Sequence, residues 1–315
     1  MKVGFIVNEF FKYGSYGGYG FATKSIAKGL QKKGVDTCLL INTSRFKKMP
    51  NPEEVEDGVL IRGYKASPKN LFFPIKEFRK TNADIYQTCN ISLDSNYAMK
   101  AQPEKKHIIN FQDPRSEKDW KEIYTHPDAL IQEGGTKSSM MYNLRVKIAY
   151  ALYRKAIKKA DGLTIQARYL GNKVNEIFKI NKKYTFIPNP VHIPHRTMQK
   201  AERPTVTFLG RLDTIKRPEM FFELARRFPH IDFLVMGKAT DDAKDRTFRE
   251  QFASNKNLKF LGLVIDEAKK SEILGKSWIL INTSLHECLP VSFLEAWAHK
   301  CAVLSCQNPD NLTEK

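Results

Sequence analysis

Short apolar runs alternate along the chain with longer stretches of helical periodicity. The runs are rich in branched and aromatic residues, which is typical of buried strands. Strands are predicted over residues 2–7, 36–41, 59–62, 85–88, 107–111, 162–165 and 184–187, and later over 206–209, 232–236, 259–261, 278–281 and 302–305. Because strands that alternate with helices pair in parallel, the pattern predicts an α/β protein whose parallel sheets carry helices on both faces.

The helical stretches and one proline-rich segment divide the chain into two domains. Residues 188–195 (PNPVHIPH) show neither a helical nor a strand period, which indicates a linker. A chain of 315 residues suits two domains, which we place at 1–190 and 191–315. Helices are predicted over 21–33, 142–159, 218–228, 245–253 and 267–274, with a last one beginning at Pro290.

Two carboxylates flank the start of the last predicted helix. The apolar run 278–281 leads through a polar turn to Pro290, which reads as strand, loop and helix. A helix that begins at the carboxyl end of a strand attracts an anion such as phosphate. Glu287 precedes this helix and Glu295 lies within it, so both could accept hydrogen bonds from sugar hydroxyls. The same pair also fits a surface helix with two solvated glutamates.

A second loop offers positive charge at the same edge of the predicted sheet. Gly210 and Arg211 directly follow a strand, and Lys216 comes shortly before a helix that begins at Pro218. A guanidinium and an ammonium at a strand's carboxyl end suit a diphosphate, although basic loop residues are also commonly solvated. The coincidence of this loop with the Glu287 loop is what favours a ligand site.

The first half of the chain holds two further site candidates. A glycine-rich loop, residues 13–20, follows the first strand, and its Gly17 and Gly18 would let the backbone approach a ligand closely. Its spacing is not G-x-G-x-x-G. Asp113, two residues after the strand 107–111, is a second candidate, but an aspartate before proline is at least as often the start of a turn.

The chain is strongly basic, which makes a polyanionic partner a candidate. Fifty-two Lys and Arg against 34 Asp and Glu leave a net charge of +18, which suits anionic lipid, nucleic acid or nucleotide phosphates. The basic helix 142–159 could lie on anionic lipid, or could turn its apolar side (Leu144, Ile148, Ala151, Leu152) into the core.

Cysteine usage and hydropathy indicate a cytoplasmic protein. The five cysteines are an odd set without C-x-x-C spacing, no His/Cys cluster resembles a zinc site, and no D-x-D pair suits Mg²⁺. No signal peptide is visible, nor any run of about 18 apolar residues. We expect a cytoplasmic location, with the inner face of the membrane as a candidate surface.

Together these motifs resemble those of the retaining nucleotide-sugar glycosyltransferases of family 4 (glycosyl transferases group 1). That family has the GT-B fold, in which two Rossmann-like domains face each other across a cleft. The most specific match is Glu287 followed by Glu295. The resemblance covers nearly the whole chain and rests further on Gly17–Gly18, residues 187–191, residues 208–211 with Lys216, and residues 260–262 with Val264.

The resemblance implies a role for each candidate residue. Arg211 and Lys216 would bind the donor diphosphate, Glu295 the ribose hydroxyls and Glu287 the hydroxyls of the transferred sugar. Glu287, Arg211 and Lys216 are thus catalytic candidates. Asp113 is the fourth, because it would lie near the reacting carbon. The remaining donor contacts would come from Gly17, Gly18, Gly210, Val264, Cys288, Leu289, Pro290 and Val291. Cys288 stands where relatives often have glycine, and Asn189-Pro190 replaces the more usual Asn-Gly.

The implied reaction is transfer of a sugar from a nucleotide sugar to a saccharide or lipid-linked acceptor, with retention and without a metal or other cofactor. A UDP-sugar is the expected donor, the first domain would bind the acceptor and the second the donor. Relatives continue beyond the position of Lys315, so the second domain is expected to lack their final helices. Two alternatives stay open: a basic nucleic-acid-binding α/β protein, and another GT-B enzyme such as a nucleotide-sugar epimerase or a phosphorylase.

Overall fold

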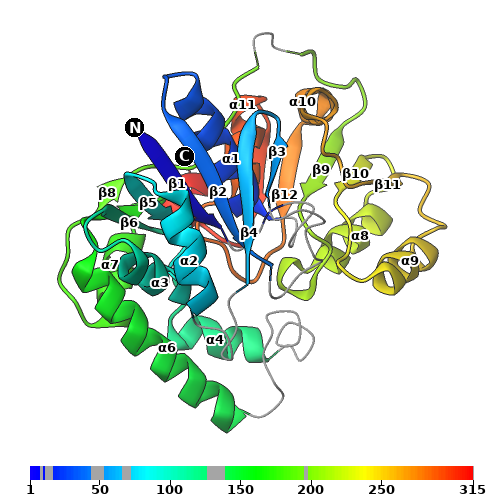
Figure 1. Cartoon of the computed structure of the whole chain (residues 1–315). Coiled ribbons are helices and arrows are strands. Elements are labelled where there is room, and N and C mark those ends of the chain that lie inside the picture. The colour runs from blue at the N-terminus through cyan, green and yellow to red at the C-terminus, as the bar shows by residue number, and fades with distance from the viewer. Residues whose placement is uncertain are drawn as a thin grey trace. The chain divides into compact units, whose positions relative to one another are not determined.

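A computed structural model describes residues 1–7, 10, 17–43, 53–65, 72–125, 139–194 and 198–314, without the side chains of 72, 73, 124 and 139–146. The chain forms two compact units, each built around one sheet (Figure 1). The first comprises Met1–Ser116 and Ser138–Pro190, and the second Glu117–Lys137 and Val191–Lys315. Helix α4 (Glu117–Tyr124), which the sequence places in the first domain, therefore groups with the second unit.

The sheet of the first unit has eight strands in the order β3-β4-β2-β1-β5-β6-β7-β8. All neighbouring strands pair in parallel except β3 and β4. The strands are β1 (Lys2–Val7), β2 (Asp36–Asn42), β3 (Glu53–Glu56), β4 (Val59–Tyr64), β5 (Ile85–Thr88), β6 (Lys106–Phe111), β7 (Gly162–Ile165) and β8 (Thr185–Phe186).

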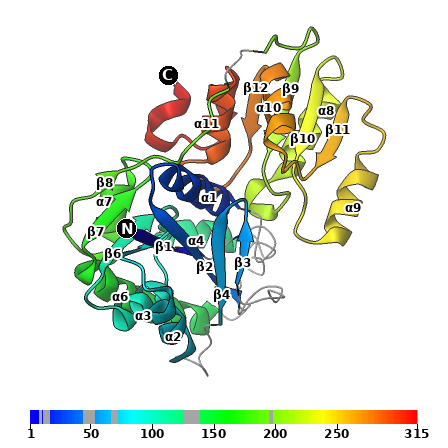
Figure 2. The same cartoon turned by 45° about the horizontal axis from the view of Figure 1, so that its top comes forward.

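Helices cover both faces of this sheet because successive side chains of a strand point to opposite sides. Phe5 and Val7 of β1 pack with Ala27 of α1, whereas Ile6 packs with Phe78 of α2 and Ala98 of α3. Figure 2 shows α1 on one side of the sheet and α2 and α3 on the other. The helices of this unit are α1 (Gly18–Gln31), α2 (Phe72–Thr81), α3 (Leu93–Ala101), α6 (Ser139–Lys159) and α7 (Leu170–Phe178).

The antiparallel edge strand β3 is a departure from the predicted parallel sheet. Its sequence, Glu-Glu-Val-Glu, has the polarity of a loop, and no strand is predicted there. In the structure its charges are paired: Glu53 lies 3.0 Å from Arg62 Nε and Glu56 lies 2.8 Å from Lys24 Nζ. Charged side chains are tolerated on an edge strand because one side of the strand has no neighbour in the sheet.

The sheet of the second unit has five parallel strands in the order β11-β10-β9-β12-β13. From β9, the strands β10 and β11 are added on one side, and β12 and β13 are added on the other side, so the strand order reverses between β9 and β12. The crevice at the carboxyl ends of such a pair is where α/β sheets bind ligands. The strands are β9 (Thr205–Leu209), β10 (Asp232–Met236), β11 (Leu258–Gly262), β12 (Ile279–Asn282) and β13 (Ala302–Ser305).

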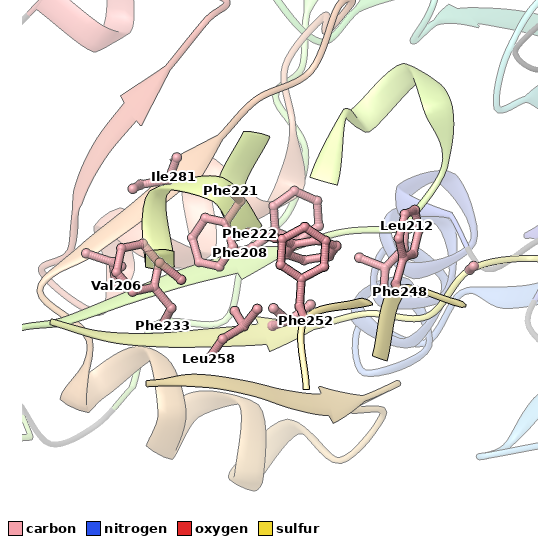
Figure 3. Packing of buried hydrophobic residues seen from close by; sticks show 13 residues of the cluster. Val206, Phe208, Leu212, Phe221, Phe222, Phe233, Phe248, Phe252, Leu258 and Ile281 are labelled. Atoms are coloured by element: carbon pink, nitrogen blue, oxygen red, sulfur yellow. The ribbon is translucent and has the colours of Figure 1, made fainter. Parts of the chain in front are cut away.

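One face of this second sheet is closed by α8 and α9 through a cluster of aromatic side chains (Figure 3). The ring of Phe222 lies 5.1 Å from that of Phe252 and 5.4 Å from that of Phe248, each edge to face. The other face is covered by α10 and α11, with Leu274 and Phe293 packed on Leu280. The helices are α8 (Pro218–Arg227), α9 (Asp242–Gln251), α10 (Glu267–Lys276) and α11 (Val291–Ala298), with 3₁₀ turns η3 (Thr214–Lys216) and η4 (Pro309–Glu314).

The predicted α/β fold class is thus confirmed, with β3 as the antiparallel exception. None of the helices in the described part of the chain is both long and apolar enough to cross a membrane.

Candidate functional site

The loop after β9 and the loop after β12 lie side by side, because these two strands are neighbours in the sheet. Several hydrogen bonds join the loops. Arg217 Nε donates to the Thr283 carbonyl at 2.7 Å, Thr283 Oγ1 donates to the Lys216 carbonyl at 2.7 Å, and Leu285 N donates to the Ile215 carbonyl at 2.8 Å. The residues that the sequence predicts at one sheet edge therefore share a single rigid substructure.

Lys216 and Glu287 form a close ion pair across these loops. Lys216 Nζ lies 2.5 Å from Glu287 Oε1, and the same oxygen accepts hydrogen bonds from Asn282 Nδ2 at 2.9 Å and Ser284 Oγ at 2.7 Å. The Glu287 side chain is only 9% exposed. Burial opposes its ionisation, but the Lys216 ammonium and the bonds from Ser284 and Asn282 lower its pKa below the usual value. Glu287 is therefore an ionised acceptor at neutral pH and a poor proton donor.

Asp213 connects the two predicted cations, and sequence reasoning missed it. One carboxylate oxygen, Oδ2, lies 3.1 Å from Arg211 Nε, and the other, Oδ1, accepts the Lys216 main-chain N–H at 3.1 Å. Asp213 is buried and caps η3. In the sequence it is only one aspartate in a polar turn, and nothing marks it as buried. Its contacts fix the position of Arg211 and the turn that carries Lys216.

The last helix begins one residue later than predicted. Pro290 is the N-cap of α11, with an extended ψ of 133°, and Val291 is the first helical residue. Proline offers no side-chain cap to the first turn, so the helix start keeps its affinity for an anion. Cys288 and Leu289, which precede it, are buried beside Glu287. Their predicted donor contacts and those of Val291 stay predictions.

The second predicted carboxylate, Glu295, lies within α11 and is paired with a residue that the sequence did not suggest. Its Oε1 accepts a hydrogen bond from Lys270 Nζ of α10 at 2.5 Å. Val264, predicted to flank the base, packs in the apolar cluster that α10 and α11 share. Glu295 and Val264 thus lie on the face of the second sheet that α10 and α11 cover.

A close backbone approach shapes the loop that holds Arg211. Gly237 follows β10, and a Cβ atom at this position would lie 1.8 Å from the Gly210 carbonyl oxygen. A Cβ at Gly210 itself would meet only the Phe208 ring, at an ordinary 3.6 Å. The packing of the protein therefore requires glycine at position 237, which the sequence did not single out. At position 210 the packing alone would allow a larger residue, so a ligand is the remaining reason for a glycine there.

Three predicted site residues belong to the first unit. Gly17 is the N-cap of α1 and Gly18 its first residue, so the prediction of both in a loop is wrong for Gly18; residues 13–16 of that loop lie outside the described residues. Glycine is well tolerated at an N-cap, which lets α1 begin here. Asp113 follows β6, and its Oδ2 accepts hydrogen bonds from Arg115 Nη2 at 2.7 Å and Nε at 2.9 Å.

Comparison with known proteins agrees with these features. Residues 203–314 match the family model of glycosyl transferases group 1. By sequence, none of the curated proteins matches the chain.

Several solved structures are similar to this chain over nearly its whole length. The apo form of the lipopolysaccharide outer core galactosyltransferase WaaB matches with a TM-score of 0.62 and 16% identity, over 97% of this chain and 80% of that one. HepE from Anabaena, in complex with UDP-glucose, matches with a TM-score of 0.67 and 13% identity over the same shares. The catalytic domain of starch synthase IV from Arabidopsis thaliana, bound to ADP and acarbose, matches with a TM-score of 0.60 and 13% identity, over 100% of this chain and 84% of that one.

The chain therefore has the GT-B fold, and residues 203–314 of its second unit match the family model of glycosyl transferases group 1.

Proposed function

We propose that the protein moves a hexose from a UDP-sugar to a saccharide or lipid-linked acceptor and retains the configuration of the anomeric carbon. The observation that carries this proposal is the pair of joined loops, in which Arg211, Lys216 and Glu287 lie together at the carboxyl ends of β9 and β12. HepE, which is described with UDP-glucose, supports UDP as the nucleotide.

The chemistry of this arrangement centres on the departing diphosphate. Negative charge grows on the phosphate oxygens as the bond to the sugar breaks, and preorganised positive charge is the main way to stabilise it. Arg211, Lys216 and the start of α11 supply that charge, so no metal ion is needed. Ionised Glu287 accepts hydrogen bonds from the sugar hydroxyls and orients the ring. Asp113 is the residue proposed to lie near the reacting carbon.

A thermal-shift panel of UDP-, GDP- and ADP-sugars, run in EDTA, tests this function. A ligand present at about 100 times its Kd stabilises the folded state by about 2.7 kcal/mol. We expect UDP-sugars to give the largest shift, and the shift to persist in EDTA because cationic side chains hold the diphosphate. If none of the nucleotide sugars shifts the melting temperature, the proposal is refuted.

An anionic membrane surface is the proposed partner of α6, on the cytoplasmic side. The sequence left open whether the apolar side of this helix enters the core. In the structure Ile148 is 55% and Leu152 is 40% exposed, whereas among residues 147–159 of the helix the buried ones are Ala156 and Ile157. Exposed lysines flank the two apolar side chains: Lys147, Lys155, Lys158 and Lys159. Such a face suits the boundary between anionic headgroups and acyl chains.

Flotation with phosphatidylserine vesicles measures this contact. Each lysine near an anionic surface contributes about 1 kcal/mol, so the double substitution Lys155→Glu and Lys158→Glu is expected to weaken binding at least tenfold. Binding by the unchanged chain is expected to fall with added salt. The matched control, Lys32→Glu with Lys33→Glu, alters two exposed lysines at the end of α1 by the same charge. An equal loss of vesicle binding in both double variants would argue against a specific role for α6. It would favour a soluble acceptor instead.

A further inference from the structure

Lys270 is a buried ammonium group that the proposed mechanism does not use. Its side chain is only 8% exposed, and lysine is almost never buried to this extent unless it is paired. Nζ lies 2.5 Å from Glu295 Oε1 and 2.9 Å from Glu267 Oε1. Glu267 is exposed, whereas the Glu295 side chain is 15% exposed. Glu295 is therefore the partner that shares the burial of Lys270.

The pair lies in a rigid contact between two helices. Lys270 and Ser271 belong to the early part of α10, and Ser271 Oγ lies 2.7 Å from His299 Nε2 at the end of α11. Below these polar links, Leu274 of α10 and Phe293 of α11 share one apolar cluster. The Glu295 carboxylate is thus held in place by an ammonium whose own position is fixed by packing.

Within the described part of the chain, the two oxygens of this carboxylate differ in their contacts. Among the described residues, Oε1 accepts the hydrogen bond from Lys270, and none donates a hydrogen bond to Oε2. An ionised carboxylate can accept about four hydrogen bonds, so Oε2 has capacity for a ligand. A carboxylate repels phosphate, so the fitting partners are neutral hydroxyl groups. Glu295 lies four residues beyond Val291, about 6 Å along the axis from the helix start. The resemblance to the glycosyl transferases of group 1 implies that the hydroxyls at this position are those of the donor ribose.

We propose that Lys270 is a positioning residue for the nucleoside of the donor. It holds Glu295 as an ionised acceptor with one oxygen directed to the ribose hydroxyls, and thereby makes the site select a ribonucleotide over a deoxyribonucleotide. The proposal rests on the proposed function, which brings a nucleoside diphosphate to this domain.

The charges around Glu295 predict how this selection depends on pH. Burial raises the pKa of Glu295 and the Glu267 carboxylate adds to this, whereas Lys270 and His299 oppose it. Burial alone would lower the pKa of Lys270, but its two carboxylate neighbours raise it, so the ammonium stays charged. Without Lys270, Glu295 should bind a proton at a higher pH. As the pH falls, the variant therefore loses the ionised carboxylate at a higher pH than the unchanged protein does. The preference for a ribonucleotide over a deoxyribonucleotide is lost with it.

The experiment compares UDP with 2′-deoxy-UDP by isothermal titration of the full chain. A hydrogen bond to a charged group contributes about 1.5–3 kcal/mol, so the unchanged protein should bind UDP at least about tenfold tighter than 2′-deoxy-UDP. In Lys270→Met the ratio of the two Kd values should fall to about one to three. Lys270→Arg should restore most of the ratio, because a guanidinium also pairs with Glu295. Lys276→Met is the matched control: it removes an exposed ammonium of the same helix, which pairs with Glu272, and should leave the ratio unchanged.

Each outcome decides the proposal. A folded Lys270→Met that keeps the full ratio, with the same pH profile as the unchanged protein, overturns it. If Lys270→Met does not fold, Glu295→Gln replaces it, and full selection in that variant overturns the proposal as well. If the unchanged protein binds both nucleotides equally, Lys270 has no positioning role, although the proposed function survives. If it binds neither nucleotide, nor any other nucleoside diphosphate, the proposed function fails first.

Discussion

Lys216→Ala is expected to lower turnover by about a hundredfold or more, the usual loss when one donor to a growing negative charge is removed. Lys216 is the only lysine of the joined loops, and it is held 2.5 Å from Glu287 at the predicted diphosphate site. Initial rates at saturating donor and acceptor measure the effect. A variant that turns over at nearly the normal rate would remove Lys216 from the mechanism.

The same substitution should also destabilise the second domain. Removing one partner of a buried ion pair leaves an uncompensated charge, here on Glu287, and costs about 3–5 kcal/mol. Lys216→Met with Glu287→Gln leaves no such charge, so it should regain much of the stability but not the turnover. Urea unfolding of the single and double variants separates the two effects. If the double variant is no more stable than Lys216→Ala, the buried charge does not explain the loss.

The pH dependence of this stability has a definite sign. The pKa of Glu287 is lower in the folded than in the unfolded chain, so the unfolded state binds more protons as the pH falls through the carboxylate range. The stability that Glu287 contributes is therefore present at neutral pH and is lost in acid. The difference in stability between the unchanged protein and Glu287→Gln should shrink as the pH falls.

Gly237→Ala is expected to displace the loop after β9, which holds Gly210 and Arg211, although residue 237 is not part of that loop. The new Cβ would lie 1.8 Å from the Gly210 carbonyl oxygen, and both chain segments are held by main-chain hydrogen bonds, Gly237 N to Gly262 O at 2.9 Å and Gly210 N to Met236 O at 3.0 Å. Backbone must therefore move, at a cost of about 1–3 kcal/mol. Because Arg211 follows Gly210, a displacement of about 1 Å could lower turnover about a hundredfold. Thermal unfolding and initial rates check both effects.

Gly210→Ala is the matched control for this prediction. It adds the same methyl group on the other side of the contact, where the nearest atom is a Phe208 ring carbon at 3.6 Å. Its stability should stay close to that of the unchanged protein, while the affinity for nucleotide falls if the backbone at Gly210 touches the ligand. Normal stability and turnover in Gly237→Ala would contradict the close approach of these two glycines.

The strand pattern predicted most of the framework, because the strands buried on both faces are continuous apolar runs. It also placed Arg211, Lys216 and Glu287 at one sheet edge, since the carboxyl ends of parallel strands must meet there. The edge strand β3 escaped prediction because its glutamates find their partners in Arg62 and Lys24, which are not its neighbours in sequence.

The residues that support the site could not be predicted in the same way. Asp213, Gly237 and Lys270 take their significance from contacts with other parts of the fold: a guanidinium, a carbonyl oxygen and a carboxylate on another helix. The basic helix α6 shows the opposite problem. It carries apolar residues on two sides, and only the packing reveals that Ile157 is buried while Ile148 is exposed.

The most direct test of the central claim, that the second domain grips a nucleotide by its diphosphate, is a titration with UDP, UMP and uridine. Arg211 and Lys216 would each pair with a phosphate, so the Kd should rise at least tenfold from UDP to UMP and further to uridine, and Arg211→Ala should narrow the first of these gaps. Equal affinities for UDP and uridine, or an unchanged gap in Arg211→Ala, would show that the diphosphate is not held by these cations.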